Sequence, residues 1–427
     1  MNVKELFHSV ARIATGEVLG RLATFVLYAY VSRQYGVEVL GIVALGQVVA
    51  IYVVECSDQG LKLIAVRLLA RDRGLADYLV PTVSRLRAGF TAVAVLLGVG
   101  YGLLGPLPDT ARGCVVAFVL AVIPYACALD WVAWGLGKFG ALAAWRSGVS
   151  ILYVLIAIAA MQITGRPVAS MATGNFTAGA LGALFLALVW RVRWRHSTQV
   201  ATPQALEAAS HELRVSRVMT LGLSNLLNLV FLNADILILG AMSTTHEVGR
   251  YSVACRPLYV MFTAFWLLTD VLYPHIAAVK DSSHARSALL QWLLVLAAAS
   301  AVCAAVLGFL APRILTVIYG SPMGATGLFR VLLIAMPLDF CFSLLWTVLV
   351  SRGYDRFVLY ALATAAVSNV LLNWIFVPRF QAEAAAWATV ASYTVLFGLM
   401  LIFVLTNDVL SRRVAEETIP PLSEYAS

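Results

Sequence analysis

The chain has 427 residues, of which 61% are hydrophobic and 12% are charged, and its mean hydropathy is +0.87. These values exclude an ordinary soluble protein, in which about half of the residues are apolar and about a quarter are charged. The formal net charge of +8 is carried by short basic runs between apolar segments, a pattern that does not favour nucleic acid as a partner. Composition therefore predicts an all-α polytopic membrane protein.

Stretches long enough to span a bilayer recur along the chain, because about 20 mostly apolar residues cross its roughly 30 Å core. Six of them precede a polar connector at residues 191–217 and six follow it, which predicts two lobes, residues 1–200 and 201–427. The expected spans are 13–33, 37–57, 87–107, 113–135, 142–163, 168–190, 216–240, 252–277, 288–310, 326–350, 357–379 and 384–406.

The orientation of these spans follows from their basic residues. Most of the 30 Lys and Arg residues fall in alternate connections, on one side of the predicted membrane. Cytoplasmic loops retain an excess of positive charge, so this side is expected to be cytoplasmic and both termini are expected there. The first twelve residues have no small-residue cleavage site and resemble an amphipathic lead-in helix more than a signal peptide.

An internal repeat relates the two predicted lobes. Gly137 is followed 35 residues later by Ala172, and Gly353 by Ala388, with a constant offset of 216 residues. Residues 39–41 (Val-Leu-Gly) likewise precede the second span as residues 247–249 (Glu-Val-Gly) precede the eighth. Six spans are an even number, so both copies enter the membrane from the same side. This indicates a parallel repeat about an axis along the membrane normal, an arrangement typical of transporters.

Ionisable residues within the spans are candidates for function, because each costs roughly 2.5 to 3.5 kcal/mol at the membrane centre on insertion scales. Glu17 and Arg21 in the first span are four residues apart, on one helical face, where they are expected to pair. For Glu17, a helix-packing ion pair and a substrate role both stay open. Arg21 is the stronger candidate, because its planar guanidinium matches a diphosphate.

Polar residues in the second half extend this set. Arg256, followed by Pro257, has a position comparable to that of Arg21, and either a central cavity or the outer interface would accommodate it. Asn225 and Asn228 share one helical face, which suits sugar contacts or hydrogen bonds between helices. The remaining candidates, for ion or proton coupling, are Asp235, Asp270, Asp339, Asp130, Glu55 and His275.

Other residue patterns predict no catalysis and no bound cofactor. The six cysteines are scattered singly with no metal-ligand spacing, so no metal and no disulfide are expected. The chain has no Walker-type glycine loop, GxSxG or HExxH motif, and its outer connections are short. Trp131 and Trp134 are typical of an interfacial aromatic belt, and a sugar-binding platform is the alternative. The chain is therefore predicted to be a carrier, not an enzyme.

Several stretches together are similar to one known family. They are Ser32–Gly41 with residues 58–61 (Asp-Gln-Gly-Leu); residues 235–240 with 248–252; and residues 369–374 (Asn-Val-Leu-Leu-Asn-Trp) with Pro378 and residues 384–389 (Ala-Ala-Ala-Trp-Ala-Thr). The family is that of the polysaccharide-repeat flippases (Wzx-type O-antigen and exopolysaccharide translocases) of the multidrug/oligosaccharidyl-lipid/polysaccharide exporter superfamily. The resemblance covers essentially the whole chain. The sequence departs from the family pattern after Pro378, where the usual glycine is missing and residues 379–383 (Arg-Phe-Gln-Ala-Glu) stand instead.

The resemblance implies a two-lobed carrier that moves an undecaprenyl-diphosphate-linked oligosaccharide from the cytoplasmic to the periplasmic face of a bacterial inner membrane by alternating access. Related lipid-linked precursor flippases use cavity arginines on the first and eighth helices, to which Arg21 and Arg256 correspond most nearly. The implied partners are the lipid-linked glycan, membrane lipids and a polysaccharide polymerase with its chain-length machinery. Two alternatives stay open: a multidrug or small-cation antiporter of the same superfamily, and a membrane glycan polymerase or transferase.

Overall fold

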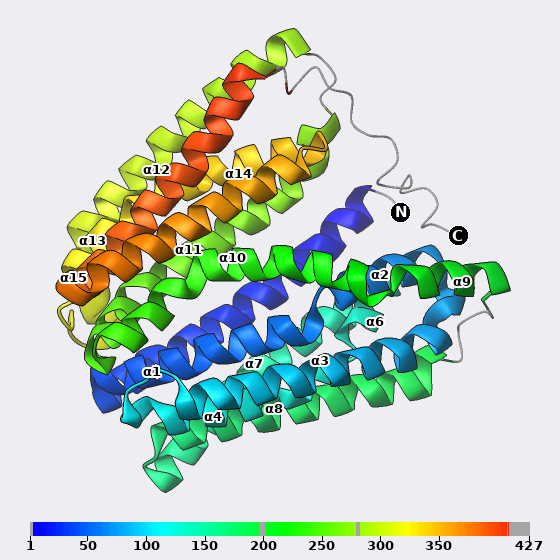
Figure 1. Ribbon diagram of the computed structural model, residues 1–427, viewed down its shortest axis with the longest axis horizontal. Helices are drawn as coiled ribbons and strands as arrows, with labels where there is room; N and C mark the ends of the chain where they lie inside the picture. Colours follow the sequence, from blue (N-terminus) through cyan, green and yellow to red (C-terminus); the bar gives the residue numbers. More distant parts are fainter. Residues whose placement is uncertain (1–2, 196–200, 279–281, 408, 410–427) are drawn as a thin grey trace. The chain divides into compact units, whose positions relative to one another are not determined.

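The computed structural model describes residues 3–195, 201–278, 282–407 and 409. Side chains are described from residue 15 onward within these ranges, except those of residues 216, 217, 220, 221, 264, 267–278, 282–286 and 288. All regular secondary structure in the described ranges is helical (Figure 1). Nine helical stretches there are long and apolar enough to cross a membrane. The chain is a multi-pass α-helical membrane protein, as its composition predicts.

Two very long helices each contain two predicted spans. Helix α1 (Val3–Asp58) contains the first two and is broken at Gly36, whose φ is 86°. Helix α15 (Asp355–Thr406) contains the last two and is broken at Gln381, whose φ is 49°. With these breaks, each predicted span overlaps a helical segment, and the span 113–135 is interrupted. The other elements are α2 (Leu61–Arg71), η1 (Arg73–Leu75), α3 (Ala76–Leu104), α4 (Asp109–Ala121), α5 (Ile123–Ala126), α6 (Asp130–Gly135), α7 (Phe139–Thr164), α8 (Pro167–Val189), η2 (Trp190–Trp194), α9 (Pro203–Glu212), α10 (Val215–Met242), α11 (Thr245–Ala278), α12 (Ser282–Tyr319), α13 (Thr326–Leu333) and α14 (Ala335–Ser351).

The predicted span 113–135 is wrong in its continuity. It is divided among α4, the short α5 and α6, with non-helical residues between Ala126 and Asp130. Pro124 lies at the start of α5, where its missing N–H and fixed φ suit a new helix start better than a helix interior. The spanning segment is therefore Asp109–Ala126, and α6 is a separate short helix beyond it.

The described chain divides into two compact units. Unit 1 comprises Met1–Val31 and Ile42–Leu229, and unit 2 comprises Ser32–Gly41 and Val230–Ser427. Helix α10 changes unit at Leu229, and the middle of α1 belongs to unit 2. The predicted lobes, residues 1–200 and 201–427, group the spans six by six along the chain, whereas these units group residues by their contacts. The division into two lobes therefore stays a prediction.

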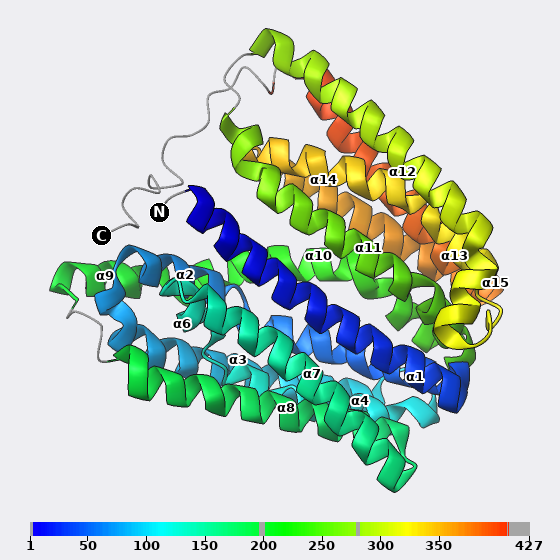
Figure 2. The ribbon, with the colours of Figure 1, turned by 180° about the vertical axis from the view of Figure 1, so that it is seen from behind.

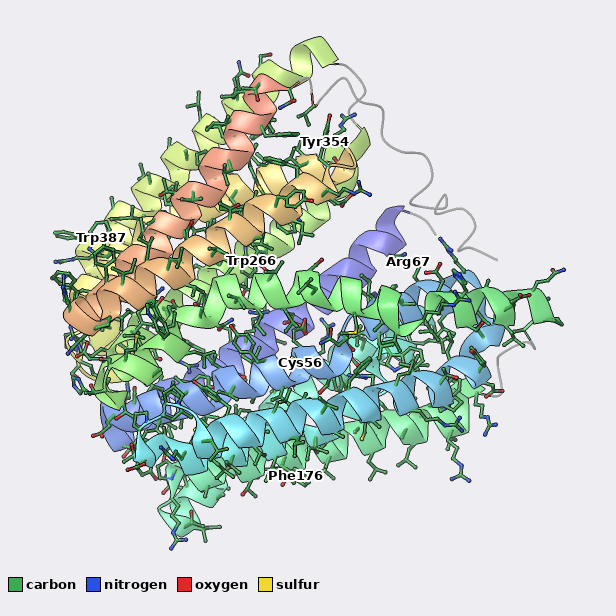
Figure 3. All side chains as sticks on the ribbon, viewed as in Figure 1. Cys56, Arg67, Phe176, Trp266, Tyr354 and Trp387 are labelled. Atoms are coloured by element: carbon green, nitrogen blue, oxygen red, sulfur yellow. The ribbon has the colours of Figure 1, made fainter. Side chains whose placement is uncertain are left out.

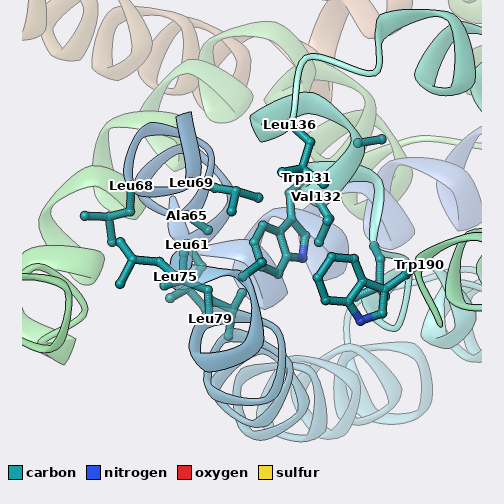
Figure 4. Packing of buried hydrophobic residues seen from close by; sticks show 14 of the residues in the cluster. Leu61, Ala65, Leu68, Leu69, Leu75, Leu79, Trp131, Val132, Leu136 and Trp190 are labelled. Atoms are coloured by element: carbon teal, nitrogen blue, oxygen red, sulfur yellow. The ribbon is translucent and has the colours of Figure 1, made fainter. Parts of the chain in front are cut away.

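Unit 1 is held together by helix pairs and a buried cluster at one end. Helix α7 packs along α8, and α3 along α4 (Figures 1 and 2). In the cluster, leucines of α2 and α3 surround Trp131 of α6, which is completely buried (Figure 4). The prediction that Trp131 belongs to an interfacial belt is therefore wrong, because its indole fills the protein core instead of facing the membrane boundary.

The connector after α8 contributes to the same cluster. Trp190, Trp194, Ala209 and Leu213 are all buried in it. Helix α9 begins where the sequence provides a cap, since the Thr202 hydroxyl accepts the Ala205 N–H at 3.3 Å and Pro203 follows directly. A segment that is polar in composition thus packs through its few apolar side chains.

Unit 2 contains a close crossing of two equivalent segments of the repeat. Gly41 lies so near α11 that a Cβ atom there would stand 1.9 Å from the Thr245 carbonyl oxygen. Reciprocally, a Cβ on Gly249 would stand 2.0 Å from the Val37 carbonyl oxygen. The Thr245 hydroxyl also donates to Glu38 at 3.2 Å. The two short repeated motifs, residues 39–41 and 247–249, therefore pack backbone against backbone, because each has a glycine at the contact.

The longer repeat also has a structural counterpart. Gly137 and Gly353 have φ values of 68° and 75°, and each stands two residues before a long helix, α7 or α15. The same conformation recurs at the same place in both halves, which supports the duplication.

Large apolar side chains are exposed along these helices. Phe176 on α8 and Trp387 on α15 are 46% and 54% exposed, and both are labelled in Figure 3. Exposed apolar side chains on long spanning helices are expected where the solvent is lipid.

Replacing Gln381 with glycine should stabilise the protein. Its φ of 49° and ψ of −128° lie in a region that glycine adopts readily and other residues adopt only under strain. We expect Gln381→Gly to raise the thermal unfolding midpoint in detergent, by a stability gain on the order of 1 kcal/mol. Ala382→Gly, one residue further and at negative φ, is the matched control and should lower the midpoint. Equal shifts for both variants would contradict this account of the break.

Adding one methyl group at the crossing should destabilise the protein. In Gly249→Ala the new Cβ meets backbone, which cannot move aside as a side chain can, so we expect a loss of about 1 to 3 kcal/mol. Gly113→Ala in α4 has open space around it and should be neutral or slightly stabilising. The comparison uses thermal unfolding of the purified variants, and tolerance of Gly249→Ala would disprove the close crossing.

Candidate functional site

The predicted pair in the first span is present in unit 1. Arg21 Nε lies 3.1 Å from Glu17 Oε1, as the spacing of four residues predicts. A second arginine, Arg146 of α7, completes the arrangement, with Nη1 at 3.0 Å from Glu17 Oε2. One carboxylate is thus bound by two guanidinium groups, each on a different oxygen. We call Glu17, Arg21 and Arg146 the bridged-carboxylate site.

Small residues position this site. A Cβ on Gly16 would stand 2.9 Å from the Ala143 carbonyl oxygen, and one on Gly20 would stand 2.9 Å from the Ser150 hydroxyl. Helices α1 and α7 therefore approach closely, and Arg146 lies between these two contact points. Small residues at helix contacts serve the same purpose in membrane proteins generally.

The bridged-carboxylate site is accessible within its unit. The side chains of Glu17, Arg21 and Arg146 are 27%, 47% and 25% exposed. Because Arg21 and Arg146 are partly exposed, the site can bind an anion other than Glu17. Guanidinium groups bind phosphate and carboxylate oxygens with the same geometry.

Sequence reasoning did not identify Arg146 as a site residue. The signal was present, because Arg146 lies within the predicted span 142–163, where an ionisable residue is a functional candidate by default. Its partner Glu17 is 129 residues away, a pairing that helical periodicity within one segment does not reveal.

A second polar site lies in unit 2 around Asp235 of α10, which is 2% exposed. The hydroxyls of Tyr251 on α11 and Thr389 on α15 donate to its Oδ2, the latter at 3.3 Å. The two hydroxyls are 3.1 Å apart, and the Ile236 backbone N–H donates to Oδ1 at 3.0 Å. Three helices thus converge on one buried carboxyl group.

Further polar residues of unit 2 are buried. Asn373 donates to the backbone carbonyl and the side-chain oxygen of Asn369, one turn away, at 2.9 and 3.1 Å. Asp339 of α14 is completely buried, near Tyr393 of α15 and Trp266 of α11, the last of which is labelled in Figure 3.

The structure places the remaining predicted residues as follows. Arg256 belongs to unit 2 and is half-buried, and α11 is helical across Pro257. Asn225 and Asn228 belong to the part of α10 in unit 1, and both are exposed. The side chains of Asp270 and His275 lie outside the described residues.

The acidic candidates at the other end of unit 1 have structural partners. Asp130 is bound by Lys62, whose ammonium also lies 5.8 Å from the ring centre of Trp134. Arg87 Nε is 3.5 Å from Asp58, and its Nη1 donates to the Ala128 carbonyl at 3.1 Å. Glu55 is half-buried nearby in α1. Lys62, Arg87, Asp58 and Asp130 form ion pairs that hold α1, α2, α3 and α6 together.

Comparison with protein families gives one match. The model of the family described as "Polysaccharide biosynthesis protein" matches residues 6–280, more than half of the chain. The chain belongs to this family. The comparison with curated proteins finds no match.

Solved structures show the same fold. The chain is similar to the structure titled "Lipid II flippase MurJ, inward closed conformation", with a TM-score of 0.62, 14% identity, and 93% of this chain and 89% of that chain covered. It is also similar to a structure of the MATE multidrug transporter DinF-BH, with a TM-score of 0.65, 14% identity and 96% of each chain covered. For the Vibrio cholerae MATE transporter VcmN in the bent form the TM-score is 0.60, the identity is 16%, and 96% and 98% are covered. This member of the family therefore has the same fold as these three transport proteins.

Removing the carboxyl group at residue 235 should destabilise unit 2. Asp235→Leu removes the carboxylate acceptor of the buried Tyr251 hydroxyl, at a cost of about 1 to 3 kcal/mol, whereas the Thr389 hydroxyl keeps the Ala385 carbonyl as an acceptor at 3.0 Å. Asp235→Asn keeps one oxygen and should lose less. Thermal unfolding in detergent measures the difference, with Asp109→Asn, 95% exposed, as control. An Asp235→Leu variant as stable as the control would contradict a structural role for these hydrogen bonds.

Proposed function

We propose that the protein is a flippase that moves undecaprenyl-diphosphate-linked oligosaccharide from the cytoplasmic to the periplasmic face of a bacterial inner membrane, for the synthesis of O-antigen or exopolysaccharide. Its family supports a role in polysaccharide biosynthesis, and its fold supports transport by alternating access. The excess of basic residues on one side supports cytoplasmic termini.

The observation that carries the proposal is the bridged-carboxylate site. Glu17 offers two oxygens to two arginines, at 3.1 and 3.0 Å. The oxygens of a diphosphate accept the same kind of charge-assisted hydrogen bond, and they bring more charge than one carboxylate. The substrate diphosphate displaces Glu17 from Arg21 and Arg146, so the arginines stay paired whether the substrate is bound or absent.

This exchange lowers the cost of an empty site. Two arginines without an anion at membrane depth would each be expensive. Glu17 offsets that cost when no substrate is bound, and it also limits how tightly the substrate is held. A carrier needs such limited affinity, because it must release its substrate on the other face.

The other candidate residues take subsidiary roles in this proposal. Arg256 is the basic residue of unit 2 that contacts the diphosphate in the course of transport. Asn225 and Asn228 contact sugar hydroxyls, and Asp235 and Asp270 take part in coupling to an ion gradient. A polysaccharide polymerase and its chain-length machinery receive the flipped glycan.

Substitution of the arginines should trap lipid-linked glycan on the cytoplasmic face. In a deletion strain, wild type restores periplasmic glycan. Arg21→Ala and Arg146→Ala reduce it by about tenfold or more at matched expression, because each loses a charge-assisted contact worth about 1.5 to 3 kcal/mol. Arg21→Lys keeps the charge and the pair with Glu17 but loses the guanidinium geometry, so it should fold normally and transport poorly. Arg195→Ala, an exposed arginine outside the spans, is the control.

The readout is the amount of undecaprenyl-linked oligosaccharide on each face, with thermal unfolding of each purified variant as the check on folding. If deletion leaves this distribution unchanged and raises drug sensitivity instead, the protein is an exporter of small molecules. Glycan elongation by the purified protein alone would establish a polymerase or transferase.

A further inference from the structure

Helix α12 has a break in its hydrogen bonding that another helix fills. Pro312 has no N–H, so the carbonyl of Gly308, four residues earlier, lacks its usual helical donor. Arg330 of α13 donates its Nε–H to that carbonyl at 2.9 Å. The interaction fixes the position of an exposed arginine near the end of a membrane span. Among the described residues, Arg330 makes this hydrogen bond through Nε, which leaves the donors of its two Nη groups available.

An apolar groove begins beside this arginine. Figure 2 shows α12 running beside α13 and α14 in unit 2, and between them is a cavity of about 590 Å³, within the range of small-molecule sites. Arg330 is the charged residue among those that line it. The apolar lining includes Ala301, Ala304, Ala305, Gly308, Leu333 and Pro337.

The groove has a polar end and an apolar body. Small residues on α12 leave the space, and the distance from Gly308 to Ala301 along the helix is about 10 Å. Phe309, which also lines the groove, is 80% exposed, so the rest of unit 2 does not cover this face. A ligand that fits must carry an anionic group at one end and a hydrocarbon chain at the other.

We propose that this groove is a binding site for an anionic membrane phospholipid, with its phosphate on Arg330 and one acyl chain along the alanines of α12. Charge complementarity supports the headgroup position, because a guanidinium group with free Nη donors binds phosphate oxygens. The depth supports it as well, since Arg330 is the fifth residue of the span Thr326–Ser351 and thus lies near the headgroup level. This site is separate from the bridged-carboxylate site and does not depend on the transported substrate.

Native mass spectrometry of the purified full-length protein tests the proposal. The protein is equilibrated in mixed micelles of phosphatidylglycerol and phosphatidylcholine in equal amounts, and the retained lipids are counted. We expect wild type to retain phosphatidylglycerol over phosphatidylcholine by about fivefold or more, the effect of roughly 1 kcal/mol. Glycerol phosphate, which has no acyl chain, should not compete at the same concentration.

Matched variants separate the two parts of the site. Arg330→Gln keeps an N–H donor for the Gly308 carbonyl but removes the charge, so the preference should disappear while the unfolding midpoint changes little. Ala304→Leu fills the groove and should reduce retention of both lipids. The control for Arg330→Gln is Arg313→Gln, an exposed arginine of α12, and the control for Ala304→Leu is Val306→Leu, 52% exposed and outside the lining.

Three results would overturn the proposal. Equal losses of preference in Arg330→Gln and Arg313→Gln would show that general surface charge selects the lipid. Unchanged lipid retention by Ala304→Leu would show that no acyl chain lies in the groove. A dimer that Ala304→Leu dissociates would identify a second copy of the chain as the occupant.

Discussion

The energetic cost of a charged or polar group in hydrocarbon is the constraint on which this structure depends. The chain has few charged residues. At both candidate sites, the charged side chains that lie within spans have hydrogen-bond or ion-pair partners, which lowers this cost. In unit 1, Glu17 holds two arginines, and in unit 2, hydroxyl groups from two helices hold Asp235. The helices have to meet where these pairs require, and small residues make that approach possible. Close backbone contact between helices therefore makes the pairing of polar side chains possible.

The same constraint connects structure with transport. A site for a diphosphate needs positive charge, yet positive charge without an anion is expensive inside the membrane. Under the proposed function, a carboxylate that shares the arginines with the substrate resolves this conflict, because the site is then neutralised in both states. The segment Ser32–Gly41, which crosses α11 closely, packs in unit 2, while the chain on both sides of it belongs to unit 1.

Hydrophobic length was sufficient to predict most of the fold. Spans of about 20 apolar residues are a strong signal, and the helices α3, α7, α8 and α10 to α12 fall where the sequence places them. The pair of Glu17 and Arg21 was also predictable, because a separation of four residues brings two side chains together on any helix. The break near residue 381 was expected from its place between two spans. The sequence did not reveal that Gln381 has the positive φ at this break; only the structure shows it.

Contacts between distant segments were not predictable in this way. Arg146 reaches Glu17, and Thr389 reaches Asp235, only because particular helices pack side by side. Trp131 has the composition of an interfacial residue, but its environment is decided by leucines from two other helices. Periodicity describes one segment at a time, whereas these features depend on several segments at once.

Transport by the purified protein tests the central claim most directly. The protein is reconstituted in liposomes that contain undecaprenyl-diphosphate-linked oligosaccharide, and the glycan exposed on the outer face is followed with an impermeant probe. The account predicts that wild type accelerates glycan exposure until both faces are equally labelled, and that a double variant with Arg21→Ala and Arg146→Ala does so no faster than empty liposomes. Equal rates for wild type and the double variant, or no acceleration by wild type, would contradict it.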